Sequence, residues 1–311
     1  MMLSNKLLSI IIPMKNESEG LELLFSRLLP ICEQLPLKFE IIAVNDGSND
    51  DTLDKLINLQ KTNNWLKIVD LSRNFGKESA LYAGFTYCKG DCAVSIDADL
   101  QDPPELILEM VEQWQQGYEV VTAVHESRDT DTYLKRNTAS VFYKFINKIS
   151  DTKLTPNAGD YRLLDRVAIS AFLQLDERVR FNKGLLTWIG FREKLIYHKR
   201  EERVAGITKW NYWKLFKFSI DGITSFSKAP LEVWFYLGLL IAGLGFIYAL
   251  YYLIKTVVFG IDVHGYPSLL TFTLFFSGLQ MIGIGILGKY IGRIFIESKH
   301  RPIFILRKFY E

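Results

Sequence analysis

The sequence predicts an α/β domain with a mainly parallel sheet, followed by two helices that cross a membrane. Over residues 8–123, short apolar segments alternate with helical segments of ten or more residues, which is the pattern of βαβ units. Further along, residues 233–254 and 265–288 contain no Asp, Glu, Lys or Arg. Each stretch reaches the length of about 20 residues that a helix needs to cross a hydrocarbon core. Two buried core helices are therefore the weaker alternative.

The expected elements follow one another in regular order. Strands are expected over residues 8–12, 40–44, 67–71, 92–96 and 120–123, because each is a short, largely apolar run. Helices are expected over residues 18–29, from about 51, over 80–87 and over 104–115, where proline opens the helix. A long amphipathic helix over residues 133–149 and a segment over 157–164, expected as a loop entering a strand, complete the domain.

Charge and cysteine content narrow the class of protein. The formal net charge of +2 gives no global basic field, so no nucleic-acid partner is expected. The three cysteines cannot all pair, and Cys88 and Cys92 have no neighbouring His or Cys of the kind that binds zinc. The apolar run at residues 7–12 is too short for a signal peptide. These features favour a reducing, cytosolic location for the soluble part.

Three carboxylates follow the fourth expected strand, at Asp97, Asp99 and Asp102. Side chains alternate along a strand, so Asp97 and Asp99 lean to the same side, at the strand end where ligands of open α/β sheets collect. Two such carboxylates repel one another unless a cation neutralises them, and Mg²⁺ or Mn²⁺ suits oxygen ligands. The alternative is a solvated acidic turn closed by Pro103.

A helix at the membrane surface is expected before the first span, over residues 211–230. Polar side chains recur there on one stripe, at Lys214, Lys217, Asp221, Thr224 and Lys228. Such a stripe beside a span predicts a helix in the membrane interface, with an ordinary amphipathic core helix as the alternative. Basic residues flank the pair of spans, whereas the connecting loop has one, Lys255. The positive-inside rule therefore places both ends of the hairpin in the cytoplasm.

Several motifs together resemble known glycosyltransferases. The loops at residues 13–17, 45–48 and 97–102, expected on one sheet edge, resemble the nucleotide-sugar domain of family 2 glycosyltransferases, the GT-A fold. The segments 97–105, 157–163 and 221–227 resemble the polyisoprenyl-phosphate glycosyltransferases, with the bactoprenol glucosyltransferases as the nearest group. The resemblance covers nearly the whole chain. It implies a cytoplasmic GT-A domain over residues 1–210, an interfacial helix over 211–230, two transmembrane helices within 231–290 and a basic cytoplasmic tail over 291–311.

The resemblance also implies roles for individual residues. Donor-binding residues, which would hold the base, ribose and diphosphate, are Pro13, Asn16, Glu17, Asp46, Arg73, Lys77, Asp97 and Gln101. Metal-binding residues are Asp97 and Asp99, and the residues implied in catalysis are Asp160 and Asp99. Acceptor-phosphate residues are Arg136, Arg200, Arg203, Thr208 and Lys209; Thr208 stands where the family usually has Ser and keeps the hydroxyl.

Plainer roles remain open for these residues. Asp46 precedes Gly47 and would suit a turn, while Arg73 and Lys77 would suit a solvated loop. Asp160 would equally close the turn at Gly159 or pair with Arg162. The acceptor-site cations would also be attracted to anionic lipid head groups.

The resemblance predicts an inverting glycosyltransferase at the cytoplasmic face of a bacterial inner membrane. It would transfer a hexose, with glucose as the first candidate, from a UDP-sugar to polyprenyl phosphate, using Mg²⁺ or Mn²⁺. The acceptor phosphate, with a second pKa of about 6, is already mostly ionised at neutral pH, so Asp160 would position groups as much as act as a base. The family implies a homo-oligomer, a tetramer. The alternatives are another donor (GDP-mannose, UDP-GlcNAc or a modified pentose) and a nucleotide-sugar-sensing partner of a flippase.

Overall fold

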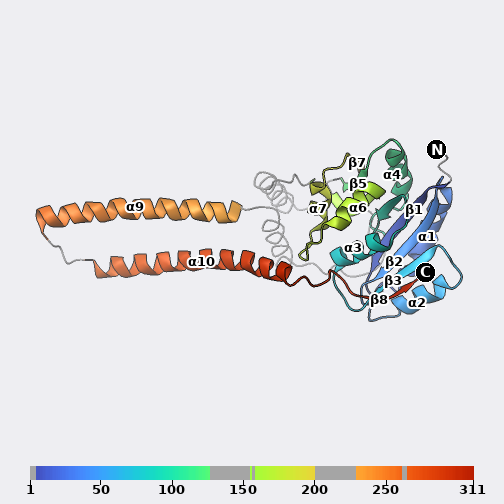
Figure 1. Cartoon of the computed structure of the whole chain (residues 1–311), viewed down its shortest axis with the longest axis horizontal. Helices are drawn as coiled ribbons and strands as arrows, with labels where there is room; N and C mark the ends of the chain where they lie inside the picture. Colours follow the sequence, from blue (N-terminus) through green and yellow to red (C-terminus); the bar gives the residue numbers. More distant parts are fainter. Residues whose placement is uncertain (1–4, 127–154, 156–157, 200–228, 261–264) are drawn as a thin grey trace.

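The computed structural model describes residues 5–126, 155, 158–199, 229–260 and 265–311. One sheet contains the strands of these segments, in the order β7-β5-β6-β4-β1-β2-β3-β8. The strands are β1 (Leu7–Met14), β2 (Lys38–Asn45), β3 (Leu66–Leu71), β4 (Cys92–Ser95), β5 (Val120–His125), β6 (Ala158–Asp165), β7 (Glu193–His198) and β8 (Leu306–Tyr310). Figure 1 shows this sheet at one end of the molecule and two long helices extending away from it.

Helices cover both faces of the sheet. They are α1 (Leu21–Gln34), α2 (Thr52–Gln60), α3 (Lys77–Tyr87), α4 (Leu106–Gln115), α6 (Arg166–Gln174) and α7 (Asn182–Trp188). Side chains of β1 alternate between two buried clusters: Ile10 packs with the face that α1, α2 and α4 cover, and Ile11 packs with the face that α3, α6 and α7 cover. This explains why the first strands are continuous apolar runs, since strands covered on both faces have no solvated side.

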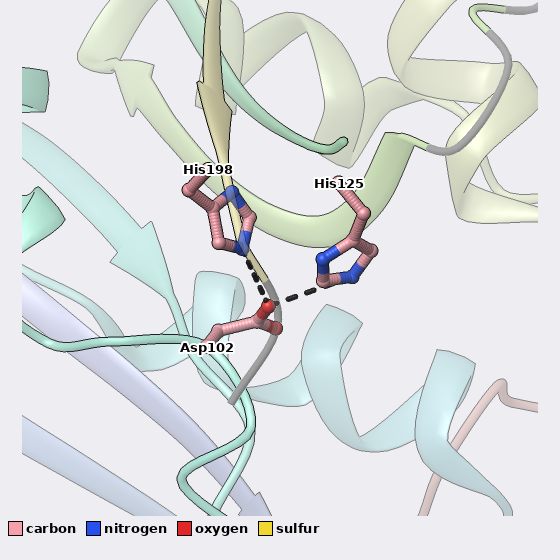
Figure 2. A group of neighbouring side chains, drawn as sticks. All are labelled: Asp102, His125 and His198. Carbon is pink, nitrogen blue, oxygen red and sulfur yellow. Dashed lines mark hydrogen bonds and ion pairs between the residues drawn. The ribbon is translucent and has the colours of Figure 1, made fainter. Parts of the chain in front are cut away.

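The central strands run in parallel, as the sequence predicts. β1 pairs in parallel with β2 and with β4, and β2 with β3. The carboxyl ends of β1, β2 and β4 therefore meet at one edge of the sheet. β6 departs from this direction, because it lies antiparallel between β4 and β5. β5 and β7 are parallel and in register up to His125 and His198, their last residues (Figure 2). The predicted α/β class with a mainly parallel sheet is confirmed.

The structure refines two local expectations. In the segment 157–164, expected as a loop entering a strand, β6 already begins at Ala158, so Asp160 lies on a strand paired in the sheet. Residues 291–311, expected as a basic tail, contain regular structure: the first part is the end of a helix that runs to Ser298, and the last part is β8, antiparallel to β3.

The composition of β8 explains why it looked like a tail. Arg307 and Lys308 are exposed, as is common on an edge strand, where charged residues discourage pairing with other chains. Arg307 donates a hydrogen bond from Nη2 to the Ser72 carbonyl at 2.8 Å. Phe309 and Tyr310 pack on opposite faces of the sheet, and the Phe309 ring stacks on Tyr87 with centroids 5.0 Å apart.

The two long helices are α9 (Ala229–Phe259) and α10 (Tyr266–Ser298). Within them, Pro230–Tyr248 and Phe275–Ser298 are long and apolar enough to cross a membrane, by length and composition. The helices lie side by side and form a hairpin (Figure 1). Their close approach depends on Gly283, where a Cβ would lie 2.0 Å from Trp234 Nε1. The expected helices at residues 133–149 and 211–228 lie outside the described residues.

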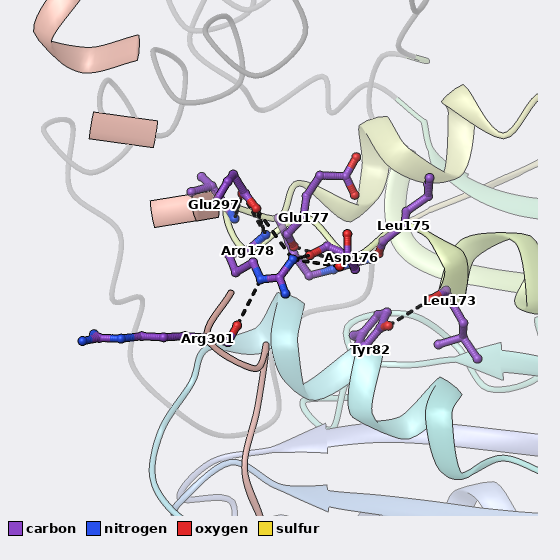
Figure 3. A network of polar contacts seen from close by, with 10 residues as sticks. Tyr82, Leu173, Leu175, Asp176, Glu177, Arg178, Glu297 and Arg301 are labelled. Carbon is purple, nitrogen blue, oxygen red and sulfur yellow. Dashed lines mark hydrogen bonds and ion pairs between the residues drawn. The ribbon is translucent and has the colours of Figure 1, made fainter. Parts of the chain in front are cut away.

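The end of α10 is bound to the domain through Glu297 (Figure 3). Its carboxylate accepts hydrogen bonds from the backbone N–H groups of Arg178 at 2.9 Å and Val179 at 3.2 Å. The Arg178 guanidinium donates to Asp176 at 2.9 Å and to the carbonyl of Arg301 at 3.0 Å. These contacts connect the hairpin to the loop between α6 and α7.

Candidate active site

A cavity of about 270 Å³ lies at the carboxyl ends of β1 and β2, beside the start of α3 and the residues that follow β4. Its lining residues are Pro13, Met14, Lys15, Glu17, Asp46, Asn74, Gly76, Lys77, Ala80, Asp97, Ala98 and Asp99. The strand-end segments that the sequence singled out therefore meet here. Asp97 and Asp99, which follow β4, line this cavity together with residues from the end of β1, from the loop after β2 and from the start of α3.

Asp46 shapes the loop that leads into α3. Its carboxylate accepts hydrogen bonds from the N–H groups of Phe75 at 2.6 Å and Gly76 at 2.9 Å. Gly47 follows with φ +61°, and a Cβ there would lie 2.5 Å from the backbone of Arg73 and Asn74. The two loops therefore pack backbone to backbone, and Asp46 both lines the cavity and holds the start of α3.

Lys77, the first residue of α3, lies between two carboxylates. Its Nζ is 2.7 Å from Asp97 Oδ1 and 2.7 Å from Asp160 Oδ2. Asp97 follows β4, while Asp160 lies on β6, the antiparallel neighbour of β4. Ser95 Oγ donates a hydrogen bond to the Asp160 carbonyl at 2.5 Å, which fixes the two strands here. Three distant segments of the chain thus form one charged cluster.

The two carboxylates that share Lys77 differ in acidity. Burial raises the pKa of Asp97, and the neighbouring Asp160 and Asp99 charges add to the effect of burial against the attraction of Lys77. Burial alone would also raise the pKa of Asp160, but Lys77, Lys183 and Arg162 outweigh it and hold the pKa at about 2. The Asp160 side chain is 14% exposed and that of Asp97 is 35% exposed, so solvent screens the Asp97 pair more. Asp160 is therefore the firmly ionised member.

Lys77 itself is held in its charged form. Burial would lower its pKa, but the Asp97 and Asp160 carboxylates raise it. Its side chain is 40% exposed, so the ammonium remains in reach of the cavity. A persistent cation next to carboxylates in a cavity suits the binding of a diphosphate together with a divalent ion.

Glu78 is a member of this cluster that the sequence did not single out. Burial and the charge of Asp160 raise its pKa to about 7. Its carboxylate accepts a hydrogen bond from the Asn182 N–H at 2.7 Å, at the start of α7. Its position directly after Lys77 was the only signal in the sequence. Arg162, a candidate partner for Asp160, is buried, and its Nη1 lies 3.9 Å from Glu193 Oε1.

Other predicted donor residues lie near the cavity without lining it. Asn16 joins the first two loops, since its Oδ1 accepts a hydrogen bond from the Asn49 N–H at 2.8 Å. The Arg73 guanidinium lies over the Phe75 ring, 4.0 Å from its centroid. Gln101 donates from its backbone N–H to Asp99 Oδ1 at 3.3 Å. The predicted acceptor residues lie outside the described part of the chain: Arg136, Arg200, Arg203, Thr208 and Lys209.

Comparison with known proteins agrees with this arrangement. The model of glycosyl transferase family 2 matches residues 9–173, and that of the GtrB C-terminal hairpin matches residues 229–294. A bactoprenol glucosyl transferase of Shigella phage SfV is 46% identical over 301 residues, which is 96% of this chain and 98% of that protein. An uncharacterized glycosyltransferase of Synechocystis sp. is 50% identical over 299 residues, covering 96% of this chain and 94% of its own.

A solved structure gives a more distant likeness. Glucosyl-3-phosphoglycerate synthase from Mycobacterium tuberculosis, in complex with Mn²⁺, UDP-glucose and phosphoglyceric acid, aligns with a TM-score of 0.48 at 16% identity, covering 70% of this chain and 78% of that one. The family match and the near full-length relatives identify the class of enzyme without it. The chain belongs to glycosyl transferase family 2 and is a glycosyltransferase with the C-terminal helical hairpin of the bactoprenol-type enzymes.

Proposed function

We propose that this enzyme transfers glucose from UDP-glucose to bactoprenol phosphate, with inversion at the sugar carbon. The observation that carries the proposal is the cluster of Asp97, Lys77 and Asp160 beside the cavity that Asp46 and Asp99 also line. The acceptor follows from the names of relatives that align over nearly the whole chain. Another nucleotide-sugar donor is the alternative within this class.

A divalent ion suits Asp97 and Asp99. Both carboxylates line one cavity. Burial and the neighbouring negative charges raise the pKa of Asp97, and a bound cation would offset both effects by stabilising the ionised carboxylate. Their oxygen atoms suit Mg²⁺ or Mn²⁺. When bound, such an ion would offset the charge that develops on the departing nucleoside diphosphate.

The protein's own groups would orient the reaction. Lys77 would pair with diphosphate oxygens while remaining next to Asp97. Asp160, with a pKa of about 2, is a weak proton acceptor. The acceptor phosphate has a second pKa of about 6 and needs little deprotonation at neutral pH. Asp160 would therefore position the sugar or Lys77, and a phosphate oxygen of the lipid would attack from the side opposite the diphosphate.

The hairpin would hold the cavity next to the lipid. A polyprenyl chain stays in the bilayer, so a water-soluble donor must be brought to the membrane surface. Lys289, Arg293 and Lys299 follow the uncharged stretch of residues 265–288 and favour a cytoplasmic position for the catalytic domain, at the bacterial inner membrane. A homo-oligomer, a tetramer by resemblance, remains a prediction.

The test is transfer from radiolabelled donors to undecaprenyl phosphate by the full chain in proteoliposomes. UDP-glucose is expected to give a labelled lipid that depends on Mg²⁺ or Mn²⁺, and Asp97→Asn is expected to abolish it. Asp54→Asn, an exposed position on α2, is the matched control and should retain full transfer. If only GDP-mannose or only UDP-GlcNAc gave a labelled lipid, that nucleotide sugar would be the donor instead of UDP-glucose. Absence of lipid product with every donor would overturn the proposal.

A further inference from the structure

A second cluster of metal-ligating side chains lies apart from the cavity. It contains Asp102, His125 and His198 (Figure 2), none of which lines the cavity described above. His125 and His198 are the last residues of the parallel strands β5 and β7 and pair in register, so their imidazoles come together at one sheet edge. Their ring centroids are 4.7 Å apart. Asp102 reaches them from the loop that also carries Asp97 and Asp99.

The Asp102 carboxylate lies at a distance from each imidazole that suits two ligands of one ion. His198 Nε2 is 3.1 Å and His125 Nε2 is 3.5 Å from Asp102 Oδ1. One atom from each side chain lies within 4.8 Å of the others. A tetrahedral ion with ligands at about 2.0–2.1 Å separates neighbouring ligand atoms by about 3.3 Å. The two measured distances lie on either side of this value.

The surroundings are ordered and largely closed to solvent. The side chains of His198 and Asp102 are 5% and 10% exposed. The neighbouring Pro103 carbonyl accepts a hydrogen bond from Tyr161 Oη at 3.1 Å, and the Tyr161 ring meets the His198 ring edge-on. The side chain of His125 is 22% exposed, so the cluster keeps one accessible side. A largely buried carboxylate next to two imidazoles is a set of side chains that suits a transition-metal ion.

We propose that Asp102, His125 and His198 bind one divalent transition-metal ion of the zinc class. Imidazole nitrogen suits zinc, cobalt and related ions, whereas the oxygen-only pair Asp97 and Asp99 suits magnesium or manganese. The ion joins the ends of β5 and β7 to the loop that carries Asp97 and Asp99, and so it positions that loop. The competing arrangement needs no ion, because two imidazole N–H groups can donate to the one Asp102 oxygen.

The experiment measures metal binding by the full chain in detergent, without reference to transfer activity. Protein freed of metal with a chelator is incubated with Zn²⁺ or Co²⁺, and bound metal is measured after gel filtration. The wild-type protein is expected to retain one zinc per chain, and its cobalt form is expected to show visible absorption typical of imidazole ligation. Asp97→Asn should retain this zinc, which separates the site from the proposed ion at Asp97 and Asp99.

Two variants and a matched control assign the ligands. His125→Gln and His198→Gln each keep a side-chain donor for Asp102 and should lose the bound zinc. His300→Gln, at an exposed position, should retain it. Retention by both ligand variants, or no zinc or cobalt in the wild-type protein at tens of micromolar free metal, overturns the proposal. If one ligand variant fails to fold, the other still locates the ion, and absence of bound zinc and cobalt from the wild-type protein still overturns the proposal. A wild-type protein that retains zinc but transfers no sugar to lipid would contradict the proposed function and leave the proposed zinc site standing.

Discussion

Lys77 is the residue on which the charge balance of the candidate site depends. Its ammonium contacts both Asp97, which lines the cavity, and Asp160 on β6. If the site holds a diphosphate and a divalent ion as proposed, the charge of its own carboxylates has to be balanced so that they do not repel the substrate. One lysine shared by two carboxylates meets this need while its exposed side stays available.

Replacement of Lys77 by Met should lower kcat/KM for the sugar donor by about 100-fold or more, since loss of one charge-stabilising donor at an active site has effects of this size. The pKa of Asp160 should rise, because burial would no longer be opposed by the ammonium. Initial rates over a range of donor concentrations measure the effect. Lys61→Met, at an exposed position after α2, is the control. Wild-type kinetics for Lys77→Met would remove this lysine from donor binding.

Glu78 should make stability depend on pH. Its pKa is raised to about 7 in the folded protein, above the ordinary value of 4.5 for a glutamate, so the folded state holds this proton more tightly than the unfolded state does. The contribution of Glu78 to stability is therefore greatest below about pH 4.5 and is lost as the pH rises from there through 7. Glu78→Gln should stabilise the protein at pH 8 by about 1–2 kcal/mol and leave it unchanged near pH 4.5.

The measurement is thermal melting of both proteins between pH 5 and pH 8. Gln keeps an oxygen acceptor for the Asn182 N–H, so the backbone contact with α7 is retained. Glu109→Gln, at an exposed position on α4, should show the same pH profile as the wild-type protein. Parallel profiles for Glu78→Gln and the wild-type protein would contradict a raised pKa at this residue.

For single residues, the sequence indicated which acidic side chains lie at the sheet edge, because they follow expected strands. It did not indicate which side chains they contact in the folded protein. Asp97, Asp99 and Asp46 follow apolar runs, so their positions at the sheet edge could be predicted. The contact of Lys77 with Asp160 requires β6 to insert antiparallel between β4 and β5, a long-range pairing without a local signal. The acidity of Glu78 likewise arises from burial in the folded chain.

Among the elements, the hairpin depends on one close contact between helices. Gly283→Leu should lower the thermal stability of the detergent-solubilised protein by about 1–3 kcal/mol, the usual cost of inserting a side chain into a packed site. A Cβ at Gly283 would meet the Trp234 ring, whereas a Cβ at Gly278 would meet nothing within 4 Å. Gly278→Leu is thus the matched control.

A second variant makes the Gly283 prediction sharper. Adding Trp234→Ala to Gly283→Leu should restore much of the lost stability, because the two positions are in contact and their effects should not add. Simple additivity of the two substitutions would show that the helices pack through another surface.

The helices and strands with continuous apolar runs could be predicted from the sequence. The two long helices and the first strands contain runs that no exposed loop would carry. β8 has only five residues, and Arg307 and Lys308 interrupt it, so its composition is that of a solvated tail. This segment becomes a strand because β3 would otherwise have an unpaired edge, and that edge is evident only once the sheet is known.

For the molecule as a whole, the hairpin is an insertion into the catalytic domain, because the chain returns from α10 to the sheet (Figure 1). A fragment ending at Lys228 should therefore aggregate, since β3 would present an unpaired edge. The same fragment joined through a flexible Gly/Ser linker to residues 299–311 should elute at its monomer volume and melt at a higher temperature. Size-exclusion chromatography and thermal melting compare the two. Equal behaviour would mean that β8 is dispensable for the sheet.

The position of β8 also sets an order of events during synthesis. Domains tend to fold from the amino terminus as the ribosome releases them, yet the last strand of this sheet is made after both long helices. The ribosome therefore synthesises the hairpin before the sheet can be completed. An unfinished polypeptide remains without its final strand, so an enzyme with a complete sheet is one whose hairpin has already been made.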